Sequence, residues 1–331
     1  MGKLRSILAA GLMLWMTMSS ALAATLAVDF ADAYNVRDLG DPSGTLGNLG
    51  GLTFLAGDPD TLLIGGGATS ASAMIYGVGL VRDEQRHIIG FDGNVTPYAA
   101  ANTPTRGIDG GLAYGPGGVL FFTTYNDNRI GQIKPGSSGP DRLIDLGALG
   151  IAGSTGSLQF VPDDLPGAGH LKIVTFRGNT WYDAEVSAAT DGTYDVELTG
   201  TKVLLGGGPE GIVYIRAGNP GFERDSILLS EWSNRQVAAY EIDANGDPIV
   251  STRREFLSDL SSAEGAAVDP LTGDFLFSNY AGDERGIVVV GGFDPPPAAV
   301  PLPATVLTLA GALLMIGPAA RRPRAAGSAH G

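Results

Sequence analysis

One pattern recurs five times along the chain and limits the folds that are open to it. Each copy begins with small residues and a short apolar run, passes through a turn rich in Gly, Pro or Asp, and continues into a second, strongly apolar run. The copy from Ala263 to Tyr280, AEGAAVDPLTGDFLFSNY, is the clearest. The five copies begin at corners formed by residues 51–54, 111–114, 157–160, 211–214 and 265–268.

The corners are separated by 60, 46, 54 and 54 residues, and no amphipathic helical pattern lies between them. Repeats of this length with about four strands each are typical of propeller blades. We therefore predict an all-β propeller with five blades, with a sixth left open in the first or third interval. The dipeptides Asp92-Gly93, Asp191-Gly192 and Asn245-Gly246 are expected to turn the chain back into fourth strands.

The last copy shows only three strands, the third over residues 286–290, and ends near Phe293. Leu26, Val28 and Phe30 alternate with other residues, as expected for a half-buried strand. We expect this N-terminal strand to complete the last blade and close the ring. Closure removes exposed strand edges.

The N-terminal segment has the features of a signal peptide. Lys3 and Arg5 precede an apolar core from Ile7 to about Met18, and the small residues Ala21 and Ala23 then frame a cleavage site. We expect signal peptidase to remove residues 1–23, which leaves a propeller domain over residues 24–293. The alternative is a retained N-terminal anchor.

The C-terminal segment has three parts. Residues 294–303 are a Pro-rich linker, and residues 304–331 hold an apolar stretch long enough to form a transmembrane helix, followed by Arg321 and Arg322. The junction carries the motif Val300-Pro301-Leu302-Pro303-Ala304.

This arrangement resembles the PEP-CTERM class of bacterial sorting signals in its VPLPA variant, with Leu302 in place of the Glu that names the class. The resemblance implies export, transient anchoring in the inner membrane and cleavage by an exosortase-type protease. It further implies a final place at the cell surface or outside the cell, together with exopolysaccharide. The alternative is an ordinary tail anchor.

Composition excludes several kinds of chemistry. The chain has no cysteine, so thiolate metal sites and Cys nucleophiles are absent. Five of the 21 basic residues lie in the terminal segments, which leaves 16 basic against 35 acidic residues between them. A domain with this net charge of −19 repels nucleic acid. It suits cation binding, or solubility outside the cell.

Three acids stand at the repeat corners. Glu210 and Glu264 occupy equivalent positions directly before Gly211 and Gly265, and Asp109 lies beside the corresponding position. In a propeller these residues begin the innermost strands, so their side chains are expected to converge at one end of the ring. Calcium would offset the repulsion between them, because it prefers six to eight oxygen ligands. The alternative is that the acids only accept hydrogen bonds from backbone amides.

Other polar and aromatic residues offer two readings each. Asn126, Asn128, Asn234 and Asn279 follow the second apolar runs, where they either supply neutral oxygens to the ion, a role assigned to Asn279, or form turns. Trp181, Tyr182 and Trp232 either stack on sugars or belong to the core.

The corner sequences resemble the NHL and gluconolactonase propellers, in AEGAAVDPLTGDFLFSNY, DGGLAYGPGGVLFF and YNDNRIGQI. The resemblance implies that Glu264 or Glu210 is a metal ligand and that Asp109 is a base. Two corners depart from the pattern, because Gly50 and Gly156 stand where an acid would be. Two functions follow: a non-catalytic binding or matrix module, and a calcium-dependent lactonase-type hydrolase.

Overall fold

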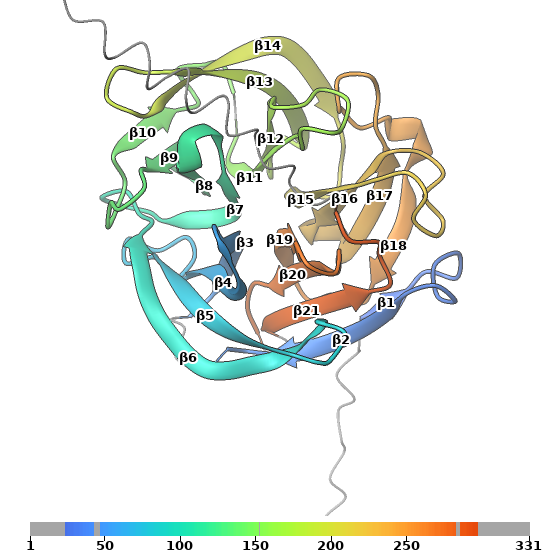
Figure 1. Ribbon diagram of the computed structural model, residues 1–331. Coiled ribbons are helices and arrows are strands. Elements are labelled where there is room, and N and C mark those ends of the chain that lie inside the picture. The colour runs from blue at the N-terminus through green and yellow to red at the C-terminus, as the bar shows by residue number, and fades with distance from the viewer. Residues whose placement is uncertain (1–23, 43–46, 152, 283–284, 297–331) are drawn as a thin grey trace, which may run out of the picture. The chain divides into compact units, whose positions relative to one another are not determined.

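The computed structural model describes residues 24–42, 47–151, 153–282 and 285–296. The chain divides into Met1–Pro295 and Pro296–Gly331, and the strands all belong to the first part. They form five antiparallel sheets arranged in a ring, each with its first strand near the centre (Figure 1). The protein is therefore a five-bladed β-propeller, as the repeats predict.

The blades are numbered along the chain. Blade 1 consists of β3 (Leu49–Leu55), β4 (Asp58–Gly66), β5 (Met74–Arg82) and β6 (Ile88–Ala100). Blade 2 consists of β7 (Ile108–Tyr114), β8 (Leu120–Thr124), β9 (Arg129–Ile133) and β10 (Arg142–Asp145). Blade 3 consists of β11 (Thr155–Phe160), β12 (Leu171–Thr175), β13 (Thr180–Ala188) and β14 (Tyr194–Leu204).

The remaining blades include the N-terminal strands. Blade 4 consists of β15 (Pro209–Ile215), β16 (Ser226–Glu231), β17 (Gln236–Glu241), β18 (Arg254–Ser258) and the added β1 (Thr25–Leu26). Blade 5 consists of β19 (Ala263–Val268), β20 (Phe275–Asn279), β21 (Gly286–Gly291) and β2 (Asn35–Gly40). Short 3-10 turns lie in the connections at η1 (Pro116–Gly118), η2 (Trp232–Asn234) and η3 (Val250–Thr252).

The core consists of one apolar layer between each pair of neighbouring blades. The second strands β8, β12, β16 and β20 are buried along their whole length, because both of their faces contact a neighbouring blade. The inner strands contact one another in the cycle β3, β7, β11, β15, β19 and back to β3. Their small residues permit this close approach at the ring axis.

The ring closes in a different way from the predicted one. β2 pairs with β21 and completes blade 5, whereas Thr25 and Leu26 pair with β18 of blade 4. Of the alternating residues, Leu26 ends β1, whereas Val28, which is 87% exposed, and Phe30, which is fully buried, lie in the turn that follows. Phe30 packs against Phe222 and Phe256 in the layer between blades 4 and 5, with ring centroids 5.3 and 4.9 Å away.

Two of the three predicted hairpin turns are confirmed. Asp191-Gly192 connects β13 to β14, and Asn245-Gly246 lies in the turn after β17. Asp92-Gly93 instead lies inside β6, where residues 92–94 lie opposite Gly79 alone in a bulge. A Cβ at Gly79 would lie 2.3 Å from the Asp92 Oδ1 atom, so the Asp92 side chain in its present position depends on the glycine.

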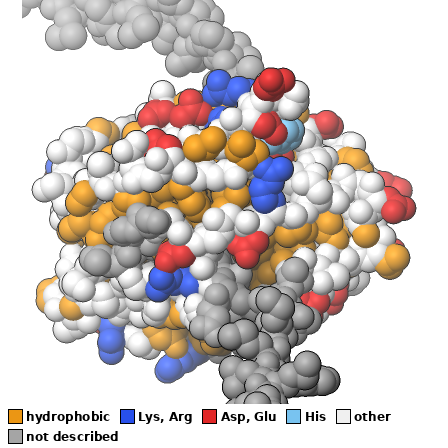
Figure 2. Space-filling view, turned by 90° about the horizontal axis from the view of Figure 1, so that it is seen from below, with side chains coloured by type: hydrophobic (Ala, Val, Ile, Leu, Met, Phe, Trp, Pro, Cys, Tyr) orange, Lys and Arg blue, Asp and Glu red, His pale blue; other side chains and the backbone are white. Residues whose placement is uncertain are grey.

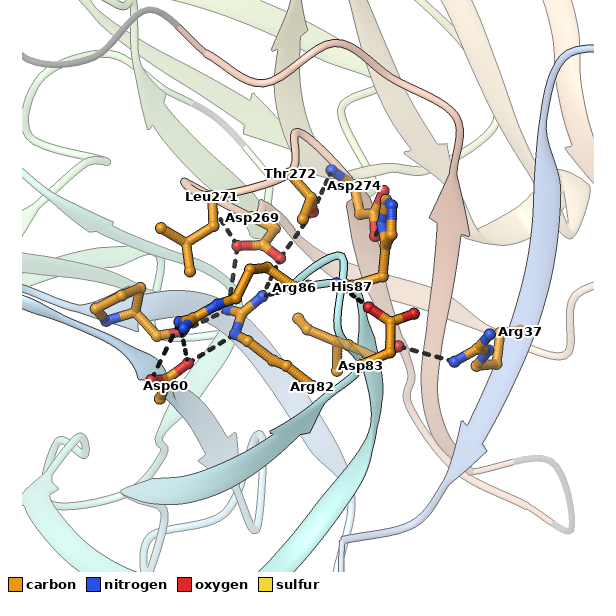
Figure 3. A network of polar contacts seen from close by, with 12 residues as sticks. Arg37, Asp60, Arg82, Asp83, Arg86, His87, Asp269, Leu271, Thr272 and Asp274 are labelled. Carbon is orange, nitrogen blue, oxygen red and sulfur yellow. Dashed lines mark hydrogen bonds and ion pairs between the residues drawn. The ribbon is translucent and has the colours of Figure 1, made fainter.

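A network of polar contacts joins blade 1 to blade 5 (Figure 3). We call the contact between these two blades the seam. The Arg82 guanidinium donates two hydrogen bonds to the buried Asp269 carboxylate, at 2.6 and 3.1 Å, and a third to Asp60. His87 Nδ1 lies 2.7 Å from Oδ2 of the buried Asp274. The hairpin between β5 and β6 is thereby held to the turn before β20.

This seam predicts a pH dependence of stability. The pKa of His87 is raised, chiefly by the hydrogen bond to Asp274, with the charges of Asp274, Asp83 and Asp269 adding to it, and burial opposes them. The pKa of Asp274 is also raised, chiefly by burial. A raised folded-state pKa means that the contribution is complete below the unfolded pKa and is lost as pH rises through the folded one.

We therefore expect the melting temperature to fall between about pH 6 and pH 8.5 by more in the wild type than in His87→Asn, whose amide does not titrate in this range. Arg37 lines the pocket beside His87, and Arg86 precedes His87 in the chain. Because salt screens the effect of these charges on His87, both proteins are measured at one ionic strength. Parallel melting curves for both proteins across this range would contradict the assignment.

Candidate metal centre

The three predicted corner acids converge at one end of the ring. Asp109, Glu210 and Glu264 each offer an oxygen, and these oxygens lie within 4.8 Å of one another. The three residues are each only 3% exposed. They start the inner strands of blades 2, 4 and 5, and these three strands contact one another, so the fold itself brings the acids together.

β-Bulges at the start of the inner strands direct these side chains. Glu210 and Gly211 lie opposite Ser230 alone, and Glu264 and Gly265 lie opposite Ser278 alone. The extra residue in each case bends the strand and re-aims its side chain.

Blade 2 has a larger bulge, and this explains the offset of Asp109 in the repeat. Asp109, Gly110 and Gly111 all lie opposite Thr123. Gly110 thus occupies the place of the glutamates, and a Cβ there would lie 2.6 Å from the Glu210 Oε2 atom. The inserted residue lets the shorter aspartate side chain join the cluster while glycine leaves room for Glu210.

The two corner glycines that depart from the acid pattern have the same role. A Cβ at Gly156 would lie 2.4 Å from the Pro209 carbonyl oxygen and 2.7 Å from Glu210 Oε2, and one at Gly50 would lie 2.6 Å from the Asp109 carbonyl oxygen. Their absence of a side chain lets the neighbouring acids and strands approach the axis.

Hydroxyl groups hold adjacent inner strands at this end of the ring. The Ser278 Oγ atom accepts a hydrogen bond from Gly265 N and donates one to the Gly50 carbonyl oxygen, which joins blade 5 to blade 1. Thr123 makes the same pair of contacts with Gly111 N and the Gly156 carbonyl oxygen. The acids are therefore placed by a fixed scaffold.

The acid cluster has no basic partner among the described residues, and this perturbs its protonation. Burial, followed by the Glu210 and Glu264 charges, holds the pKa of Asp109 well above its usual range, and Glu264 also accepts a hydrogen bond from it. Burial and the charge of Glu264 likewise raise the pKa of Glu210. Burial raises the pKa of Glu264 to about 7. Without a cation, the cluster therefore retains protons at neutral pH.

The buried oxygens are also short of hydrogen-bond donors. Asp109 Oδ2, Glu210 Oε2 and Asn279 Oδ1 have no hydrogen-bond partner within the described part of the chain. Such buried acceptors are costly unless an ion, water or proton satisfies them. Three buried carboxylates, two of them with an unpartnered oxygen, form the kind of donor set that calcium prefers, so the residues present fit a hard divalent cation.

The predicted asparagines divide into two groups. Asn126 and Asn128 have positive φ values of 63° and 51°, as expected for turn residues. Asn234 donates a hydrogen bond to Glu231, at 2.6 Å. Asn279 is buried, lies opposite Ala263 at the start of the Glu264 strand, and carries one of the unpartnered oxygens. It remains the predicted neutral ligand.

A pocket of about 160 Å³ opens onto the acids. Four aromatic residues line it, each directly after the second strand of its blade, and we call them the aromatic collar: Tyr125, Phe176, Trp232 and Tyr280. Thr69 completes the lining on the side of blade 1. Trp181 and Tyr182, by contrast, are core residues.

From the sequence, Trp232 is a candidate either for stacking on sugars or for the core, and the other three collar residues are not singled out. The signal was present, because four of the five repeats place an aromatic residue at the same offset, and the fifth has Gly67. Thr69 has a φ of 64°, an outlier for a β-branched residue, and its hydroxyl lies 3.0 Å from the Tyr280 hydroxyl. This local strain marks the position without defining a role.

The predicted sorting residues lie outside the described residues. These are Ala21, Ala23, Val300, Pro301, Leu302, Pro303, Ala304, Arg321 and Arg322. Among the described residues, none belongs to a helix with the length and apolar character needed to cross a bilayer. On the face shown in Figure 2, acidic and basic side chains are interspersed with apolar ones.

Comparison with known proteins gives no family. No family model matches the sequence, and no curated protein matches it. Similar solved structures include an auxiliary nutrient-binding protein from Bacteroides thetaiotaomicron, with 11% identity, a TM-score of 0.44, and coverage of 76% of this chain and 60% of that one.

Two further similar structures are enzymes by name. A virginiamycin B lyase from Staphylococcus aureus has 16% identity, a TM-score of 0.36, and coverage of 82% of this chain and 75% of that one. A protein provisionally described as a gluconolactonase has 13% identity, a TM-score of 0.39, and coverage of 79% and 82%. The chain spans about 60% of the length of the nutrient-binding protein. At these values the likeness concerns the propeller fold alone.

Proposed function

We propose that the protein is a binding module that holds a divalent cation of the calcium type at one end of the propeller. Asp109, Glu210 and Glu264 supply carboxylate oxygens, and Asn279 is the candidate neutral ligand. The observation that carries the proposal is the convergence of three buried carboxylates within 4.8 Å, with unpartnered oxygens and no basic neighbour among the described residues. A cation removes the mutual repulsion that raises their pKa values.

Calcium titration followed by thermal melts tests this function. An ion that binds only the folded state stabilises it by about 2.7 kcal/mol at one hundred times Kd. For a domain of this size we expect the melting temperature to rise by about 5–10 °C. Binding must also release protons, because the cluster retains them without the ion, so the calorimetric enthalpy is expected to vary with the ionisation enthalpy of the buffer. The absence of both effects at millimolar calcium would contradict the proposal.

The module is exported in this proposal. Signal peptidase removes residues 1–23, and an exosortase-type protease processes the tail near the VPLPA motif, which leaves the propeller at the surface or in the exopolysaccharide matrix. Support comes from the order of the motif, apolar stretch and arginines in residues 300–324. Mass spectrometry of the extracellular protein is expected to show a C-terminus near Ala304. An intact terminus at Gly331 would contradict the processing step.

A second candidate function is hydrolysis of a lactone. The specific observation that favours it is Asp109, whose raised pKa lets its carboxyl hold a proton at the edge of the pocket. A bound cation would supply Lewis-acid polarisation of a carbonyl oxygen. Asp109 would then take up or give a proton at the reacting oxygen. A binding module predicts no lactone hydrolysis above the buffer rate. Calcium-dependent turnover of a lactone by the wild type, lost after chelation, would favour the hydrolase instead.

A further inference from the structure

The pocket above the acids has two chemically different sides. Tyr125, Phe176 and Trp232, from blades 2, 3 and 4, form a continuous aromatic wall. Tyr125 and Phe176 have ring centroids 5.9 Å apart at 73°, and Phe176 and Trp232 have centroids 5.6 Å apart at 86°. These edge-to-face contacts fix the rings relative to one another. This wall suits the face of a ring or another flat apolar group.

The opposite side of the pocket, at blades 5 and 1, is polar. The described lining residue from blade 1 is Thr69, which is not aromatic. The hydroxyls of Thr69 and Tyr280 lie 3.0 Å apart there, and the residue that corresponds to the collar position is Gly67. Gly67 has a φ of 62° and, as a glycine, contributes no side chain to the pocket lining. A ligand seated on the aromatic wall can therefore direct polar groups toward this pair of hydroxyls.

Charge at the rim distinguishes between an anionic and a cationic ligand. The guanidinium of Arg177, which is exposed, lies 5.5 Å from the centre of the Tyr125 ring, and its Nε donates a hydrogen bond of 3.1 Å to the Tyr125 hydroxyl. With a divalent cation on the floor, a metal ion that accepts oxygen ligands and a guanidinium stand on two sides of the pocket. With one oxygen from each group, the three carboxylates and one amide supply four oxygens, fewer than the six to eight that calcium takes. Oxygens from the ligand would fill the open positions.

We infer that the pocket binds a monocyclic carboxylate, with its carboxylate at the cation and its ring against Phe176 and Trp232. This inference rests on the proposed cation site and names the ligand class for it. The shared chemistry is a six-membered ring that bears a carboxylate, which is found both in aromatic acids and in sugar acids. The pocket volume of about 160 Å³ suits a single ring.

Isothermal titration calorimetry with defined probes tests the inference on the whole protein. Benzoate and glucuronate represent the aromatic and the sugar acids, and benzyl alcohol and glucose are their neutral analogues. We expect one of the two acids to bind calcium-loaded protein at least about tenfold more tightly than its neutral analogue, and to lose binding after chelation. Which acid binds identifies the source of the ring.

Variants separate the pocket from the rest of the surface. Trp232→Leu and Arg177→Gln are each expected to weaken binding of the acid by about tenfold or more, while calcium alone still raises the melting temperature. Tyr98→Ala is the matched control, since Tyr98 is an exposed aromatic residue on the outer strand β6. It is expected to bind the acid like the wild type.

The outcomes distinguish this inference from the proposed function. If calcium does not bind, the proposed function fails, and this inference fails with it. If calcium binds but neither acid does, or if Tyr98→Ala weakens binding as much as Trp232→Leu, only the inference fails. Tetramethylammonium binding to the ion-free protein, in competition with calcium, would also overturn it, because the collar would then enclose an organic cation.

Discussion

Glu210→Gln is expected to abolish most of the stabilisation that calcium gives to the wild type. The substitution keeps the shape of the side chain but removes one of three carboxylates that lie within 4.8 Å of one another. A melting-temperature rise of about 5–10 °C in the wild type should fall to within about 1–2 °C of zero at the same calcium concentration.

The same variant should be more stable than the wild type when no cation is present. Burial is the main cause of the raised pKa of Glu210, and the charge of Glu264 adds to it. The two groups therefore repel each other when both are ionised. A neutral amide removes this repulsion, and we expect a higher melting temperature in chelator at pH 8. An interaction that merely stabilised the backbone would give the opposite sign, because its loss would lower stability with or without calcium.

Glu197→Gln is the matched control for this experiment. It makes the same change of charge on β14, the outermost strand of blade 3, where Glu197 is exposed. We expect it to respond to calcium like the wild type. Equal calcium responses in Glu210→Gln and Glu197→Gln would remove Glu210 from the cation site.

Lys172→Met is expected to lower the free energy of unfolding by about 3–5 kcal/mol. The Lys172 side chain on β12 is fully buried, and its Nζ lies 2.7 Å from Oδ1 of Asp183 and 2.7 Å from Oδ1 of Asp247. It also donates a hydrogen bond of 2.8 Å to the Asn245 carbonyl oxygen. Methionine fills a similar volume but leaves two buried carboxylates without their shared cation.

This lysine joins blade 3 to the turn after β17 in blade 4. Trp181 Nε1 donates a hydrogen bond of 2.7 Å to the same Asp247 oxygen, so the whole contact lies within the interface between the blades. Urea denaturation measures the effect, and Lys202→Met on the exposed strand β14 is the control, with an expected loss of no more than about 1 kcal/mol. A loss below about 1 kcal/mol in Lys172→Met would show that the pair of aspartates does not depend on this amine.

The sequence was sufficient to predict the ring, because the second strands are buried on both faces and therefore read as continuous apolar runs. It also placed Glu210 and Glu264 correctly, because both begin inner strands with the same bulge. The distance between them was not predictable from spacing alone. It depends on how closely the inner strands approach, which Gly50, Gly110 and Gly156 determine.

The closing strand shows where the periodic pattern fails. β2 is the outermost strand of blade 5, all six of its residues are exposed or partly exposed, and its sequence NVRDLG has little apolar alternation. Residues 26–30 do alternate, but only Phe30 is fully buried, and it lies in a turn. The alternation therefore reflects the burial of Phe30 between blades 4 and 5 and does not indicate a strand.

The bulges and the collar were missed for a related reason. An inserted residue such as Asp109, or the three residues of β6 opposite Gly79, changes which side chain faces the axis without changing composition. Tyr125, Phe176 and Tyr280 follow apolar strands, as many core aromatics do, and only the paired register shows that they share one pocket.

Anomalous scattering from crystals grown with strontium or manganese is the most direct test of the cation site. We expect one strong peak between Asp109, Glu210 and Glu264, within about 2.3–2.6 Å of oxygens from all three carboxylates for a calcium-like ion. The peak should disappear in Glu210→Gln crystals grown in the same way. A map without a peak at these residues, while the three carboxylates keep their positions in the presence of the metal, would contradict the proposed cation site.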